Sequence, residues 1–244
     1  MRGLDLLERV VSHPASLSQL ARDLKLNRST VHRLASSLVD RGYLRLISGE
    51  GYVPGPKLLE LGYAARTQLD LPRVARPHIE QLSELTGDAV HLGVLEGSTA
   101  LYLDKLPGRR RIEIGSRVGE RHPLCSTGLG KALLLDSSVK QWREYFKAEQ
   151  VPNSPRKYKP WKERMQHYAK NGFSFDLEEN EDRVRCVGAP VRDETGRIVA
   201  AISVSSVAQY MDDQRMQELV PVVKKCAESI SLELGWLPHP STED

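Results

Sequence analysis

Apolar residues recur at helical spacing in two short, neighbouring segments near the start of the chain. Both segments carry them at i, i+3, i+4 and i+7: Leu17, Leu20, Ala21 and Leu24 in the first, then Val31, Leu34, Ala35 and Leu38 in the second. Each row forms one apolar face of a helix. Asn27 precedes the second helix and can accept hydrogen bonds from its first amides, as an N-cap does. Helices joined so tightly must cross steeply, so residues 16–47 are predicted to contain a helix-turn-helix.

The second helix keeps a polar outer face once its apolar row is turned inward. Arginine on such a face can pair with phosphate or reach guanine edges, and hydroxyls can bond to backbone or bases. No acidic residue lies between Arg28 and Leu38 to repel a polyanion. The alternative is an ordinary solvated helix face. The candidate DNA-contacting residues are Ser18, Arg28, Ser29, Thr30, His32, Arg33 and Arg45.

The residues after this helix favour a winged form of the motif. Gly42 is predicted to end the helix as a C′ residue. Residues 43–47 are rich in β-formers, residues 48–51 form a turn, and residues 52–53 return, so a small hairpin follows the helix. Arg45 on this hairpin either contacts phosphate or is simply solvated. A helix before the pair, with Leu4, Leu7 and Val11 in its apolar row and Leu6 and Val10 beside them, is expected to pack behind it.

A linker and a larger second domain are predicted to follow. Residues 57–68 form a helix with Leu58, Leu61 and Ala65 on one side; this stripe either pairs between subunits or packs on its own domain. The domain boundaries are placed at 1–56 for the DNA-binding head, 57–71 for the linker helix, 72–237 for the second domain and 238–244 for a tail.

The second domain mixes helices with antiparallel strands. A helix over 74–86 is expected to turn Ile79, Leu82 and Leu85 inward, and strands are predicted at 89–95, 99–105 and 111–114. Helices over 127–135, 139–147 and 161–170 lead to a strand at 172–175, a long hairpin of 185–191 with 198–205, and a closing helix over 212–234. This order indicates an α+β fold, with helices on one or both faces of a curved antiparallel sheet.

Charge and cysteine content narrow the compartment and the partners. The net charge is +3 over 244 residues, but residues 1–57 hold nine Lys and Arg against five Asp and Glu, which leaves about −1 for the rest. A basic head on a near-neutral body is typical of a DNA-binding module joined to a domain that need not meet DNA. Three scattered cysteines suit a reducing cytoplasm. No signal peptide is visible and no apolar run is long enough to span a membrane.

Four stretches follow one another along the chain as recognisable motifs: 28–34 (RSTVHRL), 121–131 (RHPLCSTGLGK), 172–191, which contains RCVGAPV at 185–191, and 200–205 (AAISVS). In this order they resemble the IclR family of bacterial transcription regulators. The resemblance covers essentially the whole chain. It implies a winged helix-turn-helix, a linker helix and a GAF-like domain that binds a small carboxylate effector, assembled as a homodimer or a dimer of dimers. The implied function is DNA-binding regulation, interpreted here as repression, with no enzyme activity and no cofactor.

The same resemblance implies a set of effector-binding residues. Gly128 and Leu129 match a loop-to-helix entry whose amides hold an anion, and a helix N-terminus of this kind favours negative charge. The other matching positions are Asp176, Cys186, Ser203 and Ser205. Ser203 and Ser205 share one strand face because side chains alternate. Each residue also has a plainer interpretation: the Gly-Leu-Gly-Lys turn as an ordinary helix start, Cys186 as an inert core thiol, the serines as small core residues, and Asp176 as a turn cap.

Short motifs around residues 91–93 (HLG), 116–119 (SRVG) and 123–124 (PL) resemble the subgroup of regulators of pectin and hexuronate catabolism that sense 2-keto-3-deoxygluconate. The expected effector is therefore a keto acid or sugar acid of this kind. Asp176 would then face ligand hydroxyls, at the end of the ligand away from its carboxylate.

Two rival interpretations use the cysteines. In the first, Cys125 or Cys186 is the nucleophile of an enzyme, with His122 as its base. No Ser-His-Asp order, P-loop or paired-carboxylate motif accompanies them. In the second, His122 and Cys125 bind a metal, but two ligands without a further cluster fall short of a site.

Overall fold

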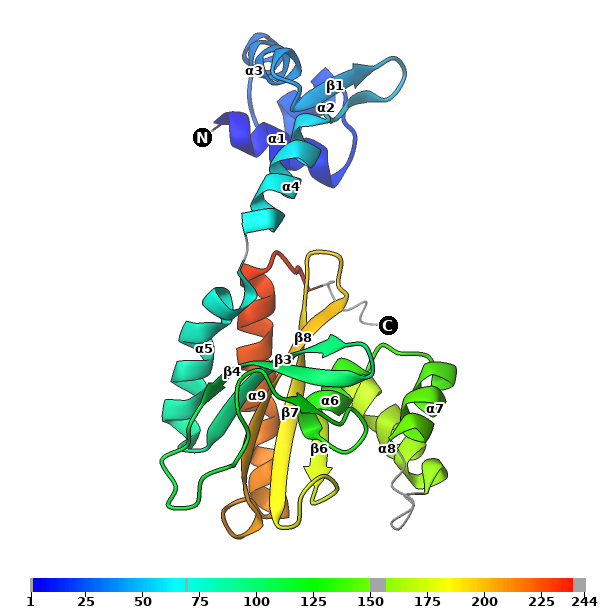
Figure 1. Ribbon diagram of the computed structural model, residues 1–244. Coiled ribbons are helices and arrows are strands. Elements are labelled where there is room, and N and C mark those ends of the chain that lie inside the picture. Colours follow the sequence, from blue (N-terminus) through cyan, green and yellow to red (C-terminus); the bar gives the residue numbers. More distant parts are fainter. Residues whose placement is uncertain (1, 69, 150–156, 239–244) are drawn as a thin grey trace. The chain divides into compact units, whose positions relative to one another are not determined.

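The computed structural model describes residues 2–68, 70–149 and 157–238, and its chain divides into two compact units, Met1–Leu69 and Asp70–Asp244. We call them the head and the effector unit (Figure 1). No helix within the described ranges is long and apolar enough to cross a membrane. The predicted linker helix groups with the head, and residues 239–244 of the predicted tail lie outside the described residues.

Three helices form the core of the head: α1 (Arg2–Ser12), α2 (Leu17–Asp23) and α3 (Arg28–Asp40). Leu6, Leu20 and Val31 are fully buried between them. The apolar row predicted for α1 was wrong in detail. Leu4 and Val11 are more than half exposed, and Leu6 and Val10 point inward, because the buried face of α1 is centred one position away from the row we chose.

Local chemistry defines both ends of the joint between α2 and α3. Ser16 caps α2 in a reciprocal capping box with Gln19, and Asn27 caps α3 by accepting from the Thr30 amide at 2.8 Å, which confirms the predicted N-cap. Between the helices Lys25 takes a positive φ of 52°. A non-glycine residue seldom adopts this conformation, and it lets the chain reverse within a few residues.

The wing is a two-stranded hairpin of β1 (Leu44–Ile47) and β2 (Gly51–Pro54). It is joined to the helices by a bridge between Tyr52 and Ala15. A Cβ on Gly51 would lie 2.5 Å from the Ala15 carbonyl oxygen, and Gly51 also has a φ of +94°, so only glycine fits there. Helix α4 (Lys57–Gln68) follows and presents Leu59 and Leu61 to solvent.

The effector unit is built on one antiparallel sheet with the strand order β5-β4-β3-β8-β7-β6. Its strands are β3 (Ala89–Glu96), β4 (Thr99–Leu106), β5 (Arg121–His122), β6 (Ser174–Leu177), β7 (Val184–Arg192) and β8 (Ile198–Val207). Its helices are α5 (Leu71–Thr86), α6 (Gly128–Leu133), α7 (Val139–Ala148), α8 (Tyr158–Asn171) and α9 (Asp213–Glu233), with a 3-10 turn at Ala208–Tyr210. The predicted α+β class is confirmed.

Helices cover both faces of this sheet. Figure 1 shows α5 and α9 side by side on one face, and α6 crosses the other, against β7 and β8. Helices α7 and α8 lie beyond α6 and pack their aromatic side chains together. The indole of Trp161 donates to the Cys125 carbonyl at 2.7 Å and that of Trp142 to the Leu134 carbonyl at 2.6 Å, so these helices hold both ends of the α6 segment.

Two predictions for the effector unit were wrong. Residues 111–114 form no strand but part of the loop 107–120, in which Lys105 donates to the carbonyls of Ile114 and Ser116, both at 2.6 Å. These carbonyls therefore bond to a side chain instead of a neighbouring strand. Leu85, predicted to be inward on α5, is 71 % exposed, because Ala75, Ile79 and Leu82 already fill the buried face of α5.

Candidate functional site

The outer face of α3 is the first candidate site. Arg28, Ser29, His32 and Arg33 are exposed and Thr30 is half-buried, as the apolar periodicity predicts. Within this set the Ser29 hydroxyl donates to the Asn27 side chain at 2.9 Å. Two guanidinium groups and an imidazole thus stand on one helix face, in a segment that holds no acid between residues 28 and 39.

Ser18 and Arg45 flank this face in the chain and lie on other elements of the head. Ser18 is exposed on the first turn of α2, and Arg45 is exposed on β1 of the wing. In the head, then, the predicted DNA-contacting residues are solvent-accessible, with Thr30 the least so. We call these seven residues the DNA face. Their contacts with DNA remain predictions.

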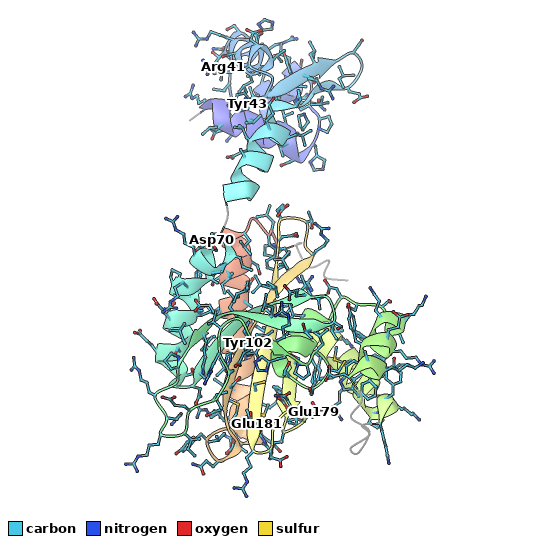
Figure 2. All side chains as sticks on the ribbon, viewed as in Figure 1. Arg41, Tyr43, Asp70, Tyr102, Glu179 and Glu181 are labelled. Carbon is cyan, nitrogen blue, oxygen red and sulfur yellow. The ribbon has the colours of Figure 1, made fainter. Side chains whose placement is uncertain are left out.

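The second candidate site is a cavity of about 310 Å³ in the effector unit, on the α6 face of the sheet. Its floor comes from β3, β4, β6, β7 and β8, and its sides come from His122 on β5, from Thr127 at the start of α6, from the loop 107–120 and from the loop between β6 and β7. The lining residues are His91, Tyr102, Ile114, Gly115, Ser116, Glu120, His122, Thr127, Asp176, Asn180, Glu181, Val184, Cys186 and Ser205. Tyr102 from β4 and Glu181 from the β6–β7 loop are labelled in Figure 2. A cavity of this size is at the small end of ligand sites.

Three of the six predicted effector residues line this cavity. Asp176, Cys186 and Ser205 stand in one row across neighbouring strands, since Asp176 is registered with Cys186 and Cys186 with Ser205. Asp176 also accepts from the Glu179 amide at 2.8 Å, so the interpretation of Asp176 as a turn cap holds alongside its place on the wall.

The other three predicted residues lie behind the wall. Leu129 is fully buried in the core, and Gly128 donates its amide to the Cys186 sulfur at 3.2 Å. Ser203 is 1 % exposed, does not line the cavity, and its hydroxyl has no hydrogen-bond partner among the described residues.

Glycines bring the start of α6 against β7. A Cβ on Gly128 would lie 2.7 Å from the Cys186 sulfur, and a Cβ on Gly188 would lie 2.6 Å from the Gly128 carbonyl oxygen. Larger residues at either position would force the helix away from the sheet. The close approach therefore fixes where the cavity ends, and it explains why the Gly-Leu-Gly-Lys turn contains glycine at residue 128.

Tyr102 on the wall was missed by the sequence analysis, and His91 was named only within a short motif and His122 only in the rival interpretations. The ring of Tyr102 stacks on His122 at 4.2 Å between centroids and lies 5.0 Å from His91. Burial lowers the pKa of His91 to about 3, helped by the nearby charges of Lys105 and His122, and burial also lowers the pKa of His122. Both imidazoles are therefore neutral at neutral pH, and neither brings a positive charge to the cavity.

Other lining residues come from loops, where no periodicity marks them. Ser116 and Glu120 belong to the loop 107–120, and Asn180 and Glu181 to the β6–β7 loop. The only signal in the sequence was indirect: His91 and Ser116 lie in two of the short motifs that resemble one subgroup.

The cysteine-based rivals find no support in this geometry. Burial, and next to it the charge of Asp176, raises the pKa of the Cys186 thiol to about 12, so the thiolate needed for nucleophilic attack is scarce at neutral pH. Cys125 is fully buried. Over the residues that the structure describes, no group of three or more His, Cys, Asp or Glu is placed to hold a metal ion.

Comparisons with known proteins match the chain in both units. Residues 63–232 match the family model described as the bacterial transcriptional regulator IclR C-terminal domain, and residues 1–47 match the IclR helix-turn-helix domain. The HTH-type transcriptional regulator KdgR of Escherichia coli is 30 % identical over 236 residues, covering 92 % of this chain and 87 % of KdgR. The regulator XynR of the same organism is 28 % identical, with 90 % and 89 % covered.

Solved structures give the same result. The Thermotoga maritima IclR structure is 31 % identical and covers 96 % of this chain and 98 % of its own, with a TM-score of 0.63. The Agobacterium tumefaciens repressor BlcR is 24 % identical, covers 96 % of each chain and has a TM-score of 0.82, a likeness of fold.

Proposed function

This chain belongs to the IclR family of bacterial transcription regulators, and from that premise we propose that it is a repressor whose DNA face binds an operator and whose cavity binds a small organic acid that changes operator affinity. The observation that carries the DNA half is the DNA face itself, with Arg28, Arg33 and His32 exposed and no acidic side chain among its members. Phosphate neutralisation supplies affinity for any duplex, and contacts to base edges supply sequence preference.

We propose that two heads act together. In a dimer, two α3 helices enter successive major grooves of a near-palindromic operator, about 34 Å apart. Leu58 and Leu61 share one face of α4, and Leu61 is exposed there, so this stripe is suited to pair the helix with its copy. A single head has few cations, so a second set of contacts is needed for specific binding.

Operator binding tests the DNA half directly. Fluorescence anisotropy of the full chain with a duplex from the region beside its own gene should show tight, salt-sensitive binding, with a random duplex as the control. The slope of log affinity against log salt counts the phosphates that are neutralised. Binding that ignores salt, or that does not distinguish the two duplexes, would refute the proposed operator function.

For the effector half we propose a hydroxylated or keto monocarboxylate such as 2-keto-3-deoxygluconate. The support is the polar wall of the cavity, where Asp176 and Ser205 can bond to hydroxyls, together with the short motifs that resemble one subgroup of the family.

A thermal-shift screen of sugar acids and short keto acids, followed by operator binding with each hit, tests this half. The effector must change operator affinity, and it can do so only through unequal affinity for two arrangements of the protein. Ser205→Ala should blunt the response and spare operator binding without effector. Ser203→Ala is the matched control, because Ser203 is off the wall, and it should change the response less. An equal loss in both variants would argue against the cavity.

A further inference from the structure

The cavity has an unusual balance of charge for a site that takes an organic acid. Three carboxylates line it, those of Glu120, Asp176 and Glu181, and no Lys or Arg does so among the described residues. Lys105 lies near His91, but its ammonium group is bonded to two backbone carbonyls of the loop 107–120. A ligand with several negative charges would therefore be repelled, whereas carboxylates are good acceptors for ligand hydroxyls.

His91 supplies the polar centre of the floor, and it stands between two hydroxyls. Its Nε2 is 2.7 Å from the Ser116 hydroxyl, a normal hydrogen bond that holds the ring in one orientation. Its Nδ1 is 3.5 Å from the Ser205 hydroxyl, at the long limit where a hydrogen bond is weak. Both His91 and Ser205 line the cavity, so this second pair can still accept a better partner.

Neutral imidazole suits a hydroxyl better than it suits an ion. It offers one donor and one acceptor, and a hydroxyl can be either. Because His91 is 1 % exposed and its burial strongly opposes protonation, it cannot form an ion pair with a ligand carboxylate at neutral pH. Beside it the stacked rings of Tyr102 and His122 make a flat wall against which the C–H groups of a carbon chain can pack.

We infer that the cavity takes a hydroxyl-rich ligand with no more than one negative charge, and that His91 is a specificity-determining residue that binds one ligand hydroxyl together with Ser205. This inference rests on the proposed effector role of the cavity and narrows it. Short keto acids without hydroxyls and dicarboxylates are excluded as preferred ligands. Ser116 acts as a positioning residue that fixes the imidazole from the loop side.

The test uses the full chain and four probes: 2-keto-3-deoxygluconate and D-gluconate, which are hydroxylated monocarboxylates, pyruvate, which has no hydroxyl, and 2-oxoglutarate, which has two carboxylates. Calorimetry should show that at least one hydroxylated probe binds more than about tenfold tighter than pyruvate and 2-oxoglutarate, since unmet polar groups discriminate strongly. Tighter binding of pyruvate or 2-oxoglutarate would overturn the inference and leave the regulator function intact.

Two variants of His91 complete the test. His91→Phe keeps a ring against Tyr102 and removes both nitrogens. It should lower the affinity for the hydroxylated probe by about tenfold and change the affinity for pyruvate little. His91→Gln keeps a donor and an acceptor and should recover most of that loss. Equal affinity of wild type and His91→Phe for the hydroxylated probe would refute the role of His91.

Operator binding and thermal melting are measured on the same samples. A variant that loses both operator binding and its melting transition has misfolded. In that case the inference is judged from the His91→Gln variant and from the relative affinities of the four probes for the wild type. If no hydroxylated probe binds at millimolar concentration, the inference fails, whereas operator binding reports separately whether the DNA half of the proposed function stands.

Discussion

The two candidate sites of this chain are built in opposite ways. The DNA face is exposed, and most of its residues come from the single helix α3. The cavity is a partly open pocket, and its residues come from the six strands β3 to β8 and from the loops between them, between positions 91 and 205. An exposed face on one helix follows from local periodicity, whereas a pocket of this kind depends on which distant strands become neighbours. Mutations in the DNA face should therefore change DNA binding without changing stability. Mutations around the cavity should act mostly by disturbing its packing.

The largest expected effect is on packing at the cavity. In Gly188→Ala the added methyl would lie 2.6 Å from the Gly128 carbonyl oxygen and 2.9 Å from the Ser174 hydroxyl, so the free energy of unfolding of the effector unit should fall by about 3 kcal/mol. All three tryptophans, Trp142, Trp161 and Trp236, lie in this unit. Their fluorescence during urea unfolding therefore reports its stability alone.

Gly115→Ala is the matched control for that substitution. Nothing lies within 4 Å of a Cβ at Gly115, so stability should hardly change. Equal unfolding midpoints for the Gly188→Ala variant and the wild type would mean that α6 and β7 separate easily, and the contrast between a packed cavity and a free DNA face would then be lost.

Arg33→Ala should have the next largest effect, and on DNA binding alone. Operator affinity should fall by about 1–3 kcal/mol if the guanidinium contacts a base, and by less if it contacts only phosphate. Arg33→Lys separates the two cases, because lysine keeps the charge and loses the bidentate fork. Anisotropy at several salt concentrations measures both. Thermal unfolding followed by circular dichroism, which also senses the helices of the head, should be unchanged, and a destabilised Arg33→Ala protein would show that this residue supports packing.

A smaller effect concerns pH and belongs to the cavity alone. Because burial lowers the pKa of His91 to about 3 from 6.5, the unfolded chain binds a proton there that the folded chain does not. His91 therefore makes stability fall as pH drops from about 6.5 towards 3, by at most about 1.4 kcal/mol per pH unit. His91→Phe should flatten this part of the urea-unfolding profile relative to wild type. Gly115→Ala, which changes no titratable group in the same unit, should keep the wild-type slope.

How far the sequence could predict each site follows from the same contrast. Asn27, Gly42 and the apolar rows of α2 and α3 predicted the helix-turn-helix correctly, because each signal acts within a few residues. The loop 107–120 was mistaken in part for a strand, because its conformation depends on bonds from Lys105 and His91. No local pattern shows that His91 and Ser205 would lie on neighbouring strands of the sheet.

The family resemblance supplied part of what periodicity could not. It pointed to Asp176, Cys186 and Ser205, which line the cavity, but it also included Gly128, Leu129 and Ser203, which do not. Ser203 and Ser205 do share one strand face, as predicted, yet only Ser205 lines the cavity. Alternation along a strand gives the face of a residue and not its distance from the cavity.

The smallest expected effect tests whether the DNA face depends on the stability of its helix. Asn27→Ala removes the side chain that accepts from the Thr30 amide and should destabilise the head by about 1 kcal/mol. Asn27→Asp keeps the cap and adds a carboxylate next to Arg28. If the DNA face acts through its exposed charges, Asn27→Asp should fold as well as wild type by circular dichroism and yet bind operator more weakly, most clearly at low salt. Wild-type affinity in Asn27→Asp, together with weak binding in Asn27→Ala, would instead mean that helix stability limits DNA binding.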